Sequence, residues 1–179
     1  MGRVKATEPA LLFVGTLYSD AEIFKRSKEI LGKKFGDILL ESPSTAWGYS
    51  SYYKDELGWP LFRQFIFFKN LIDPGILSDT KLKTNHIEDR LSSKGKRRIN
   101  LDPGYLTLAK IVLASTKNYA HRIYLGKGIY GEVSLLFKGG IYNSYLYTYR
   151  DYKDKTSVDI FMNARALLKK MLSASKNPV

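Results

Sequence analysis

The order of hydrophobic patterns along the chain constrains the fold more than any other feature of the sequence. LLFVGTLYS (residues 11–19) is a short apolar run that predicts a buried strand, and residues 23–35 then repeat apolar side chains at helical spacing before Gly36. DILLES (37–42) and LFRQFIFFKNLI (61–72) predict two more strands. This order of strand, helix, strand and strand opens a ferredoxin-like unit, which a second helix would complete.

Three helices are expected around this framework. The first begins at an S-x-x-E capping box formed by Ser19 and Glu22. Residues 79–92 carry a thin apolar stripe and are the candidate for the second helix. A C-terminal helix over residues 157–173 is predicted by its apolar stripe and by Thr156, which would cap it.

The chain is rich in strand-like runs from Ile99 onward, and short turn-forming segments separate them, which is typical of a meander. Two Asp-Pro-Gly segments, LIDPGIL (71–77) and NLDPGYL (100–106), predict turns because Asp, Pro and Gly each favour turn geometry. For residues 103–115 we expect a strand after such a turn, and a helix capped by Asp102 is the open alternative.

We therefore expect one α+β domain over residues 1–179. Its mixed or antiparallel sheet should have a ferredoxin-like start, a C-terminal β-meander and flanking helices. Residues 42–60 lack a clear period and predict a long loop. Residues 1–9 and 174–179 are expected to form a flexible start and a flexible tail. A chain of this length can bury roughly 70% of the surface that its unfolded form exposes, which is enough for a sizeable core.

The residue types that are missing exclude several classes of protein. The 179 residues include no cysteine and two histidines, so disulfide scaffolds, thiol nucleophiles and cysteine-bound metals are excluded, and we predict no metal site. No run reaches the roughly eighteen apolar residues of a membrane helix, and the apolar patch near the start is too short for a secretory signal. We therefore expect a cytoplasmic protein without a membrane partner. The motif G-x-x-x-x-G-K-[ST] does not occur, which argues against a conventional GTPase or ATPase.

The charge distribution favours an anionic partner. The formal net charge is +12, from 29 Lys and Arg against 17 Asp and Glu, and residues 81–98 hold much of the excess. Such a patch raises the local concentration of nucleic acid or of phosphorylated metabolites. The alternative is that these side chains only solvate the surface, because net charge bears on solubility as well as on binding.

LGKGIYGEV contains Gly126, Gly128 and Gly131, a full G-x-G-x-x-G motif. The kinase and dinucleotide-binding versions of this motif both fail on context, because no kinase catalytic motif follows and the next element is a strand rather than a helix. We therefore predict a hairpin turn whose backbone N–H groups could face an anion beside Lys127.

Polar residues that interrupt the strand-like runs mark the candidate site. If residues 103–115 contain a strand, neighbouring strands could bring Lys110 together with Arg122 and Glu132 on one face. A carboxylate between two cations is either a structural ion pair or an acid–base and anion-binding site. The candidates divide by role: His121, Glu132 and Asp102 as catalytic groups, Arg97, Arg98, Lys110 and Arg122 as anion-binding groups, and Asn100, Tyr105 and Tyr124 as orienting groups.

The stretch RRINLDPGYLTLAKIVLASTKNYAHRIYLGKGIYGEV (97–133) resembles an uncharacterised bacterial family described as a domain of unknown function, DUF4416. The motifs LFVG, SYYKDELG, FRQF, LIDPG, KLKTN and YTYRDY extend the likeness over nearly the whole chain. The family pattern has the same residue types at Asn100, Asp102, Pro103, Gly104, Tyr105, His121, Arg122, Tyr124, Gly128 and Glu132. It often has alanine where Gly131 stands and usually has proline where Arg150 stands. The resemblance implies a family but no activity, and the GTP-binding label of some members finds no supporting motif in this chain.

Three functional hypotheses follow. The first is a protein that binds or acts on a phosphorylated small molecule, with a nucleotide as the leading candidate, in a basic cleft. The second is an RNA-binding accessory protein, because the chain combines its basic charge with 13 tyrosines that could stack on bases. The third is a structural or interaction module without catalysis, which an exposed apolar patch would mark. Whether the protein is an enzyme, which cofactor it uses and how it assembles stay open.

Overall fold

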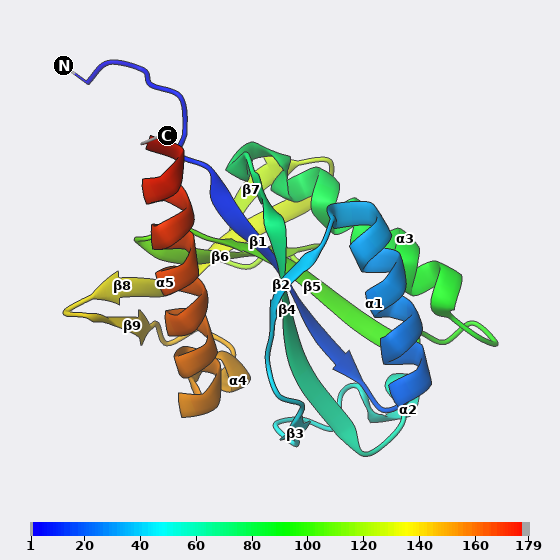
Figure 1. Cartoon of the computed structure of the whole chain (residues 1–179). Helices are drawn as coiled ribbons and strands as arrows, with labels where there is room; N and C mark the ends of the chain where they lie inside the picture. Colours follow the sequence, from blue (N-terminus) through cyan, green and yellow to red (C-terminus); the bar gives the residue numbers. More distant parts are fainter. Residues whose placement is uncertain (1, 177–179) are drawn as a thin grey trace.

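The computed structural model describes residues 2–176 and contains one open sheet in which all paired strands are antiparallel (Figure 1). The strands are β1 (Ala10–Tyr18), β2 (Ile38–Glu41), β3 (Thr45–Trp47), β4 (Leu61–Ile72), β5 (Ile99–Leu106), β6 (Lys110–Ser115), β7 (Ile123–Gly126), β8 (Ile129–Lys138) and β9 (Ile141–Ser144). The helices are α1 (Ala21–Phe35), α2 (Lys54–Leu57), α3 (Leu77–Leu91), α4 (Arg150–Lys153) and α5 (Lys155–Lys176), with a 3-10 turn, η1, at Pro74–Ile76. The α+β class with an antiparallel sheet is confirmed.

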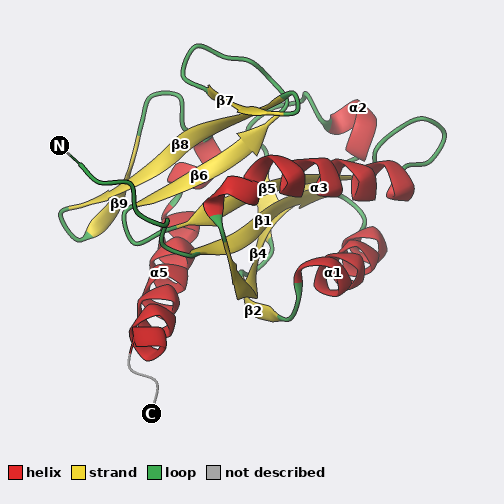
Figure 2. Cartoon of the chain, turned by 90° about the horizontal axis from the view of Figure 1, so that it is seen from above, coloured by secondary structure: helices red, strands yellow, loops and turns green. Residues whose placement is uncertain are grey.

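The first half of the chain confirms the ferredoxin-like start. Its main elements follow the order β1, α1, β2, β4, α3, β5, and their strands lie side by side as β2-β4-β1-β5. Helices α1 and α3 cover one face of this half (Figure 2). Residues 42–60, which we expected to form a long loop, also contain the short strand β3 and the short helix α2.

Strand β1 lies inside the sheet and is buried on both faces, which explains its uninterrupted apolar run. Leu12 and Val14 pack toward α1 and α3, whereas Leu11 and Phe13 belong to the core beneath α5. Phe161 of α5 packs edge-on against Phe13, with ring centroids 5.3 Å apart. The sheet therefore lies between α1 and α3 on one face and α5 on the other (Figure 1).

The second half of the chain extends the same sheet from β5 through β6, β8 and β7, and β9 pairs with β8. The β-rich extension predicted from Ile99 onward is therefore confirmed. Strand β6 pairs with β8 rather than with β7, so β7 takes the outer position, and the strand order differs from that of the simple meander we expected. The connection over residues 116–122 has to pass from β6 to that outer strand.

The two Asp-Pro-Gly segments have different structures. Asp73 accepts a hydrogen bond from the backbone N–H of Gly75 and starts η1, as predicted for a turn. The segment at 102–104 instead lies inside β5, so both the turn and the alternative helix predicted there are wrong. An added Cβ at Gly104 would lie 2.5 Å from Phe13 Cζ and 2.6 Å from the carbonyl oxygen of Val112, so this glycine permits the close approach of three strands.

The ends of the helices differ from the predicted caps. Asp20, not Ser19, accepts hydrogen bonds from the backbone of the first turn of α1. Helix α5 begins at Lys155, which places Thr156 inside the first turn rather than at the cap, and it continues through residues 174–176 of the expected flexible tail. Residues 2–9 form neither helix nor strand, and Met1 and residues 177–179 lie outside the described residues. No helix in the described chain is both long and apolar enough to cross a membrane.

Candidate functional site

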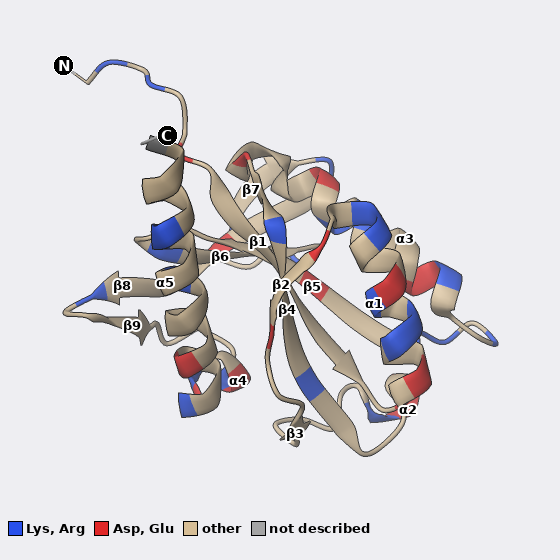
Figure 3. Cartoon of the chain, viewed as in Figure 1, with Lys and Arg blue, Asp and Glu red and all other residues tan. Residues whose placement is uncertain are grey.

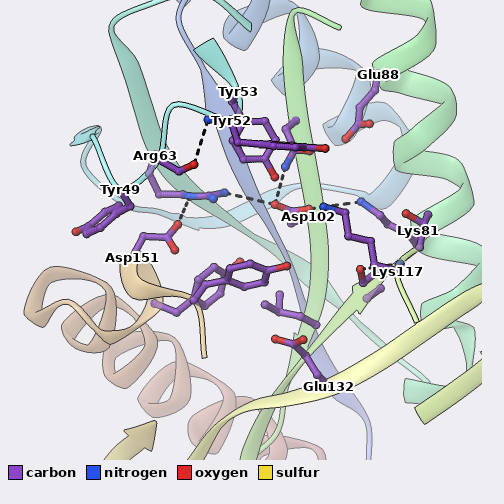
Figure 4. Close-up of a pocket in the computed structure, with 18 of the residues that line it drawn as sticks. Tyr49, Tyr52, Tyr53, Arg63, Lys81, Glu88, Asp102, Lys117, Glu132 and Asp151 are labelled. Atoms are coloured by element: carbon purple, nitrogen blue, oxygen red, sulfur yellow. Dashed lines mark hydrogen bonds and ion pairs between the residues drawn. The ribbon is translucent and has the colours of Figure 1, made fainter. Parts of the chain in front are cut away.

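A cleft opens where β5 and β6 separate. Strand β5 pairs with β1 along its whole length but with β6 only from Gly104 to Leu106. Residues 99–103 of β5 therefore have no pairing with β6, and a cleft of about 700 Å³ lies beside them. The segment from β3 to α2, helix α3 and the residues at α4 form the other walls (Figure 4).

The cleft combines aromatic and charged side chains of both signs. Its lining includes six tyrosines and one tryptophan, six Lys or Arg and five Asp or Glu. The formal charges therefore nearly balance, and the cleft is less basic than the +12 charge of the chain suggested. Lys and Arg also lie on α1, α3, α5 and the sheet, with Asp and Glu among them (Figure 3).

The closed end of the cleft depends on Gly15 in β1. Gly15 pairs with Phe65 of β4 on one side and with Asp102 of β5 on the other. An added Cβ here would lie 2.7 Å from Tyr152 Oη and 3.4 Å from Arg63 Nη1. Because glycine leaves this space open, Arg63 reaches from β4 across β1 and places Nη1 3.7 Å from Asp102 Oδ2 (Figure 4).

Arg63 is held mainly by Asp151 of α4. Its Nε donates to Asp151 Oδ2 at 2.7 Å, both side chains are 7% exposed, and Trp47 Nε1 donates to the same oxygen at 3.2 Å. Burial alone would lower the pKa of Arg63, but Asp151 and the other anionic groups around it raise that pKa. Within residues 2–176, Arg63 Nη1 has no hydrogen-bond partner. The pair fixes α4 against the sheet and leaves one guanidinium nitrogen directed toward Asp102.

Asp102 is the point where several polar side chains meet. Asn100 Nδ2 donates to Asp102 Oδ2 at 2.6 Å, and Lys81 Nζ from α3 lies 3.5 Å from Asp102 Oδ1. Lys81 also donates to the carbonyl oxygen of Leu101 at 2.8 Å. The Asp102 side chain is 30% exposed, whereas Lys81 and Arg63 are each 7% exposed. The carboxylate is thus the part of this group that the cleft can reach, and the cations lie behind it.

A second polar cluster lies around Glu132 of β8. Arg122 Nε donates to Glu132 Oε2 at 2.7 Å, and His121 Nε2 lies 3.1 Å from the same oxygen. Ser134 Oγ donates to Glu132 Oε1 at 3.0 Å, and Arg122 Nη2 donates to the hydroxyl of Tyr149 at 2.9 Å. The expected meeting of Arg122 with Glu132 is therefore present. Every oxygen of the carboxylate already has a protein partner.

A third cluster ties α2 and α3 to β5 through Arg97. Arg97 Nε and Nη2 donate to the two carboxylate oxygens of Glu56 at 2.6 and 2.7 Å, and Nη1 donates to Asn100 Oδ1 at 2.9 Å. Glu88 of α3 lies 3.3 Å from Arg97 Nη1. Burial raises the pKa of Glu88, whereas the hydrogen bonds from Arg97 lower the pKa of Glu56. Arg97 therefore orients Asn100, which in turn holds Asp102.

The open side of the cleft is formed by aromatic residues and by two cations without ion pairs. Tyr52 and Tyr53 pack edge to face, and Lys117 Nζ lies 4.9 Å from the centre of the Tyr52 ring. Burial and the charge of Asp102 raise the pKa of Tyr53. Lys117 and Arg150 are exposed, and neither makes an ion pair with any residue of the described chain. Figure 4 shows Tyr52 and Tyr53 on one side of Asp102 and Glu132 on the other.

Half of the predicted site residues line this cleft. The residues that do so are Arg97, Asn100, Asp102, Arg122 and Glu132. The other five do not: His121, Arg98, Lys110, Tyr105 and Tyr124. His121 still contacts Glu132 and stacks on Tyr147, with ring centroids 4.3 Å apart.

Lys110 and Arg98 lie outside the cleft and have other neighbours. Lys110 is exposed at the start of β6, opposite Leu136, so the expected joining of Lys110 to Arg122 and Glu132 is wrong. The single long strand expected there is in fact β5 and β6, joined by a turn, which carries Lys110 away from the cleft. Arg98 pairs with Asp20 at the start of α1.

Tyr105 and Tyr124 also lie outside the cleft. Tyr105 packs against apolar residues of α3, β6 and β8, and burial raises its pKa. Tyr124 is 60% exposed on β7 and contacts Tyr130. The G-x-G-x-x-G segment forms the predicted hairpin between β7 and β8, and Lys127 at its tip pairs with Asp79 of α3.

Several cleft residues were missed by the sequence reasoning. Arg63 is a charged residue inside an apolar strand, as Lys110 was expected to be. A search of every predicted strand for such charged residues would have found it. Lys81 and Asp151 gave no such signal, because polar residues are ordinary in exposed helices. Within residues 2–176, no three His, Asp or Glu side chains gather in a way that would hold a metal ion.

A family model described as Domain of unknown function (DUF4416) matches residues 8–167. The match includes every residue that lines the cleft. No curated protein and no solved structure matches the chain.

Proposed function

The chain belongs to the DUF4416 family, and we propose that its cleft binds a phosphorylated small molecule, with a nucleotide as the leading candidate. The single observation that carries this proposal is the pairing of an aromatic wall with two unpaired cations at the opening of a concave site. A volume of about 700 Å³ lies within the usual range for small-molecule sites. Tyrosine faces stack on bases, and Lys and Arg bind phosphate oxygens.

Lys117 and Arg150 are the cations that we assign to the phosphate. Their charges are not neutralised by carboxylates of the described chain, in contrast to Arg63, Arg97 and Arg122, which all have acidic partners. An anion near the opening also avoids the carboxylates at the closed end. The proposal therefore directs the phosphate outward and the rest of the molecule inward.

A thermal-shift screen of nucleoside monophosphates and sugar phosphates tests the binding. A ligand at a hundred times its dissociation constant stabilises the folded protein by about 2.7 kcal/mol, which raises the melting temperature measurably. The double variant Lys117→Ala/Arg150→Ala should weaken binding of the best compound at least tenfold, by loss of charge-assisted contacts of roughly 1.5–3 kcal/mol. Lys25→Ala serves as the matched control, because Lys25 is exposed on α1 and does not line the cleft.

Two results would overturn the proposal. If no phosphorylated compound shifts the melting temperature, the cleft does not bind this class. If mixed RNA binds far more tightly than any mononucleotide, and its affinity falls steeply with salt, the RNA-binding alternative replaces the proposal.

A further inference from the structure

The charged group at the closed end of the cleft presents a carboxylate rather than a cation. Asp102 is 30% exposed, whereas Arg63 and Lys81, its two cationic neighbours, are each 7% exposed. A molecule that enters the cleft therefore meets the carboxylate before it meets either cation. A phosphate or carboxylate group would be repelled at this position, and a cationic group would compete with Lys81 and Arg63 for the same carboxylate.

Neutral hydrogen-bond donors fit Asp102 best. The carboxylate is fixed in place by Asn100, which donates to Oδ2 at 2.6 Å and is itself oriented by Arg97. An ionised carboxylate only accepts hydrogen bonds, so its partner must donate. Two neighbouring donors can bind the two oxygens of one carboxylate together.

The cleft that holds this carboxylate also contains hydrogen-bond donors without partners. Within residues 2–176, the hydroxyl of Tyr53 and the ammonium of Lys117 make no hydrogen bond, and both residues line the same cleft. Arg63 Nη1, behind the carboxylate, is a further buried donor without a partner. A ligand group that both donates and accepts would satisfy Asp102 and its surroundings together. The hydroxyl group has this property, whereas an ammonium group or an amide N–H group only donates.

We propose that Asp102 binds two adjacent hydroxyl groups of a sugar, and that the phosphate of the same molecule lies toward Lys117 and Arg150. The inference deepens the proposed function and rests on it. The ring face of a sugar would lie against Tyr53, which combines apolar area with a polar tip. The same diol chemistry occurs in the ribose of a nucleotide and in a free sugar phosphate, and the experiment separates these two sources.

Isothermal titration calorimetry on the wild-type protein compares probes with and without the diol. The nucleotide pair is adenosine 5′-monophosphate and its 2′,3′-dideoxy analogue, and the sugar pair is ribose 5-phosphate and its 2,3-dideoxy analogue. Loss of hydrogen bonds to a charged acceptor should weaken binding at least about tenfold in whichever pair binds. Binding of the nucleotide pair alone identifies ribose in a nucleotide, and comparable binding of the sugar pair identifies a free sugar phosphate.

Asp102→Asn supplies the second measurement. This variant should lower the affinity for the diol probe to the level of its dideoxy analogue, and it should leave the affinity for the analogue unchanged. Inorganic phosphate should bind the variant at least as tightly as the wild type, because the variant keeps Lys117 and Arg150 and lacks one negative charge of the cleft. Asp37→Asn is the matched control, because Asp37 is exposed between α1 and β2, does not line the cleft and makes no ion pair among the described residues.

The outcomes separate the two proposals. Equal binding of diol and dideoxy probes to the wild type would refute the diol inference and leave the proposed function standing. Binding of unphosphorylated adenosine as tightly as the monophosphate, with loss of binding in dideoxyadenosine, would refute the phosphate assignment and support the diol site. If neither phosphorylated nor unphosphorylated probes bind, both proposals fail. The wild-type comparison decides the matter even if Asp102→Asn does not fold.

Discussion

Arg122 donates its Nε proton to Glu132 at 2.7 Å, and the two side chains are 2% and 1% exposed. His121 and Ser134 are also within hydrogen-bond distance of the carboxylate, so each of its oxygens has a partner within the protein. The ion pair fixes the connection that leads into β7 against strand β8. Removing one partner would leave an uncompensated charge inside the protein.

Glu132→Gln should therefore be strongly destabilising. The variant keeps the size of the side chain but leaves Arg122 without its counter-charge, which costs about 3–5 kcal/mol for a buried pair. Urea denaturation monitored by circular dichroism measures this loss. Replacement of both partners, Arg122→Met with Glu132→Leu, should recover part of it, because no unpaired charge then remains.

An exposed ion pair provides the control for that experiment. Lys155 and Asp159 form a pair one helical turn apart, with side chains 88% and 57% exposed. Asp159→Asn should change the free energy of unfolding by about 0.5 kcal/mol or less. A loss below about 1 kcal/mol for Glu132→Gln would mean that the buried pair contributes no more than such a surface pair.

Gly15→Ala tests the path by which Arg63 crosses β1. The added Cβ would lie 2.7 Å from Tyr152 Oη, and Tyr152 is buried and unable to withdraw, so we expect a loss of about 1–3 kcal/mol. Addition of Tyr152→Phe should restore most of it, because the hydroxyl is the atom in conflict and has no partner in the described chain. Gly32→Ala is the matched control: nothing lies within 4 Å of its added Cβ, and alanine in a helix should stabilise by up to about 1 kcal/mol. Equal effects at the two glycines would contradict the packing argument.

The Arg97–Glu56 pair predicts a pH-dependent contribution to stability. Arg97 lowers the pKa of Glu56 below its ordinary value of 4.5. The folded state therefore prefers the ionised form, and the stabilisation is present above pH 4.5 and is lost as the pH falls through the lowered pKa. Because both side chains are partly exposed, Glu56→Gln should cost about 0.5–1 kcal/mol at pH 7, and the difference from the wild type should disappear in acid.

Denaturation midpoints at several pH values check this prediction. Glu29→Gln is the reference, because Glu29 is exposed on α1 and has no ion pair in the described chain, so its effect should be small at every pH. A loss of stability in Glu56→Gln that becomes larger as the pH falls would contradict the prediction. Such a result would mean that the pair does not favour ionised Glu56 in the folded protein.

Most of the fold could be predicted from local sequence patterns. The predictions failed where tertiary contacts override the local preference of a segment. Strands β1 and β4 could be predicted from their apolar runs, and helix α1 from its apolar stripe. Burial on one or two faces of an element imposes a period on its sequence. Asp102 to Gly104 has turn-forming composition, yet it lies in a strand because Gly104 is needed against Phe13. That requirement comes from another strand and is invisible in the segment itself.

Only part of the candidate site could be predicted, because local sequence patterns do not show which segments the fold brings together. The polar residues of β5 and β8 stood out because charges are unusual in strands, and Asn100, Asp102 and Glu132 do line the cleft. The position predicted for Lys110 was wrong because a turn divides the apparently continuous apolar run into β5 and β6. This turn places Lys110 on a different strand from Asn100 and Asp102. Lys117 and Arg150 lie in exposed segments with ordinary compositions, so only the fold brings them to the opening of the cleft.

The separation of β5 from β6 has a consequence for dynamics. The cleft lies at the seam between the first and second halves of the sheet, where only three residue pairs join the two strands. A molecule bound there would bridge the seam and restrain both sides together. Slower amide hydrogen exchange in β6 would then report occupancy, even though such a molecule need not touch the backbone of that strand.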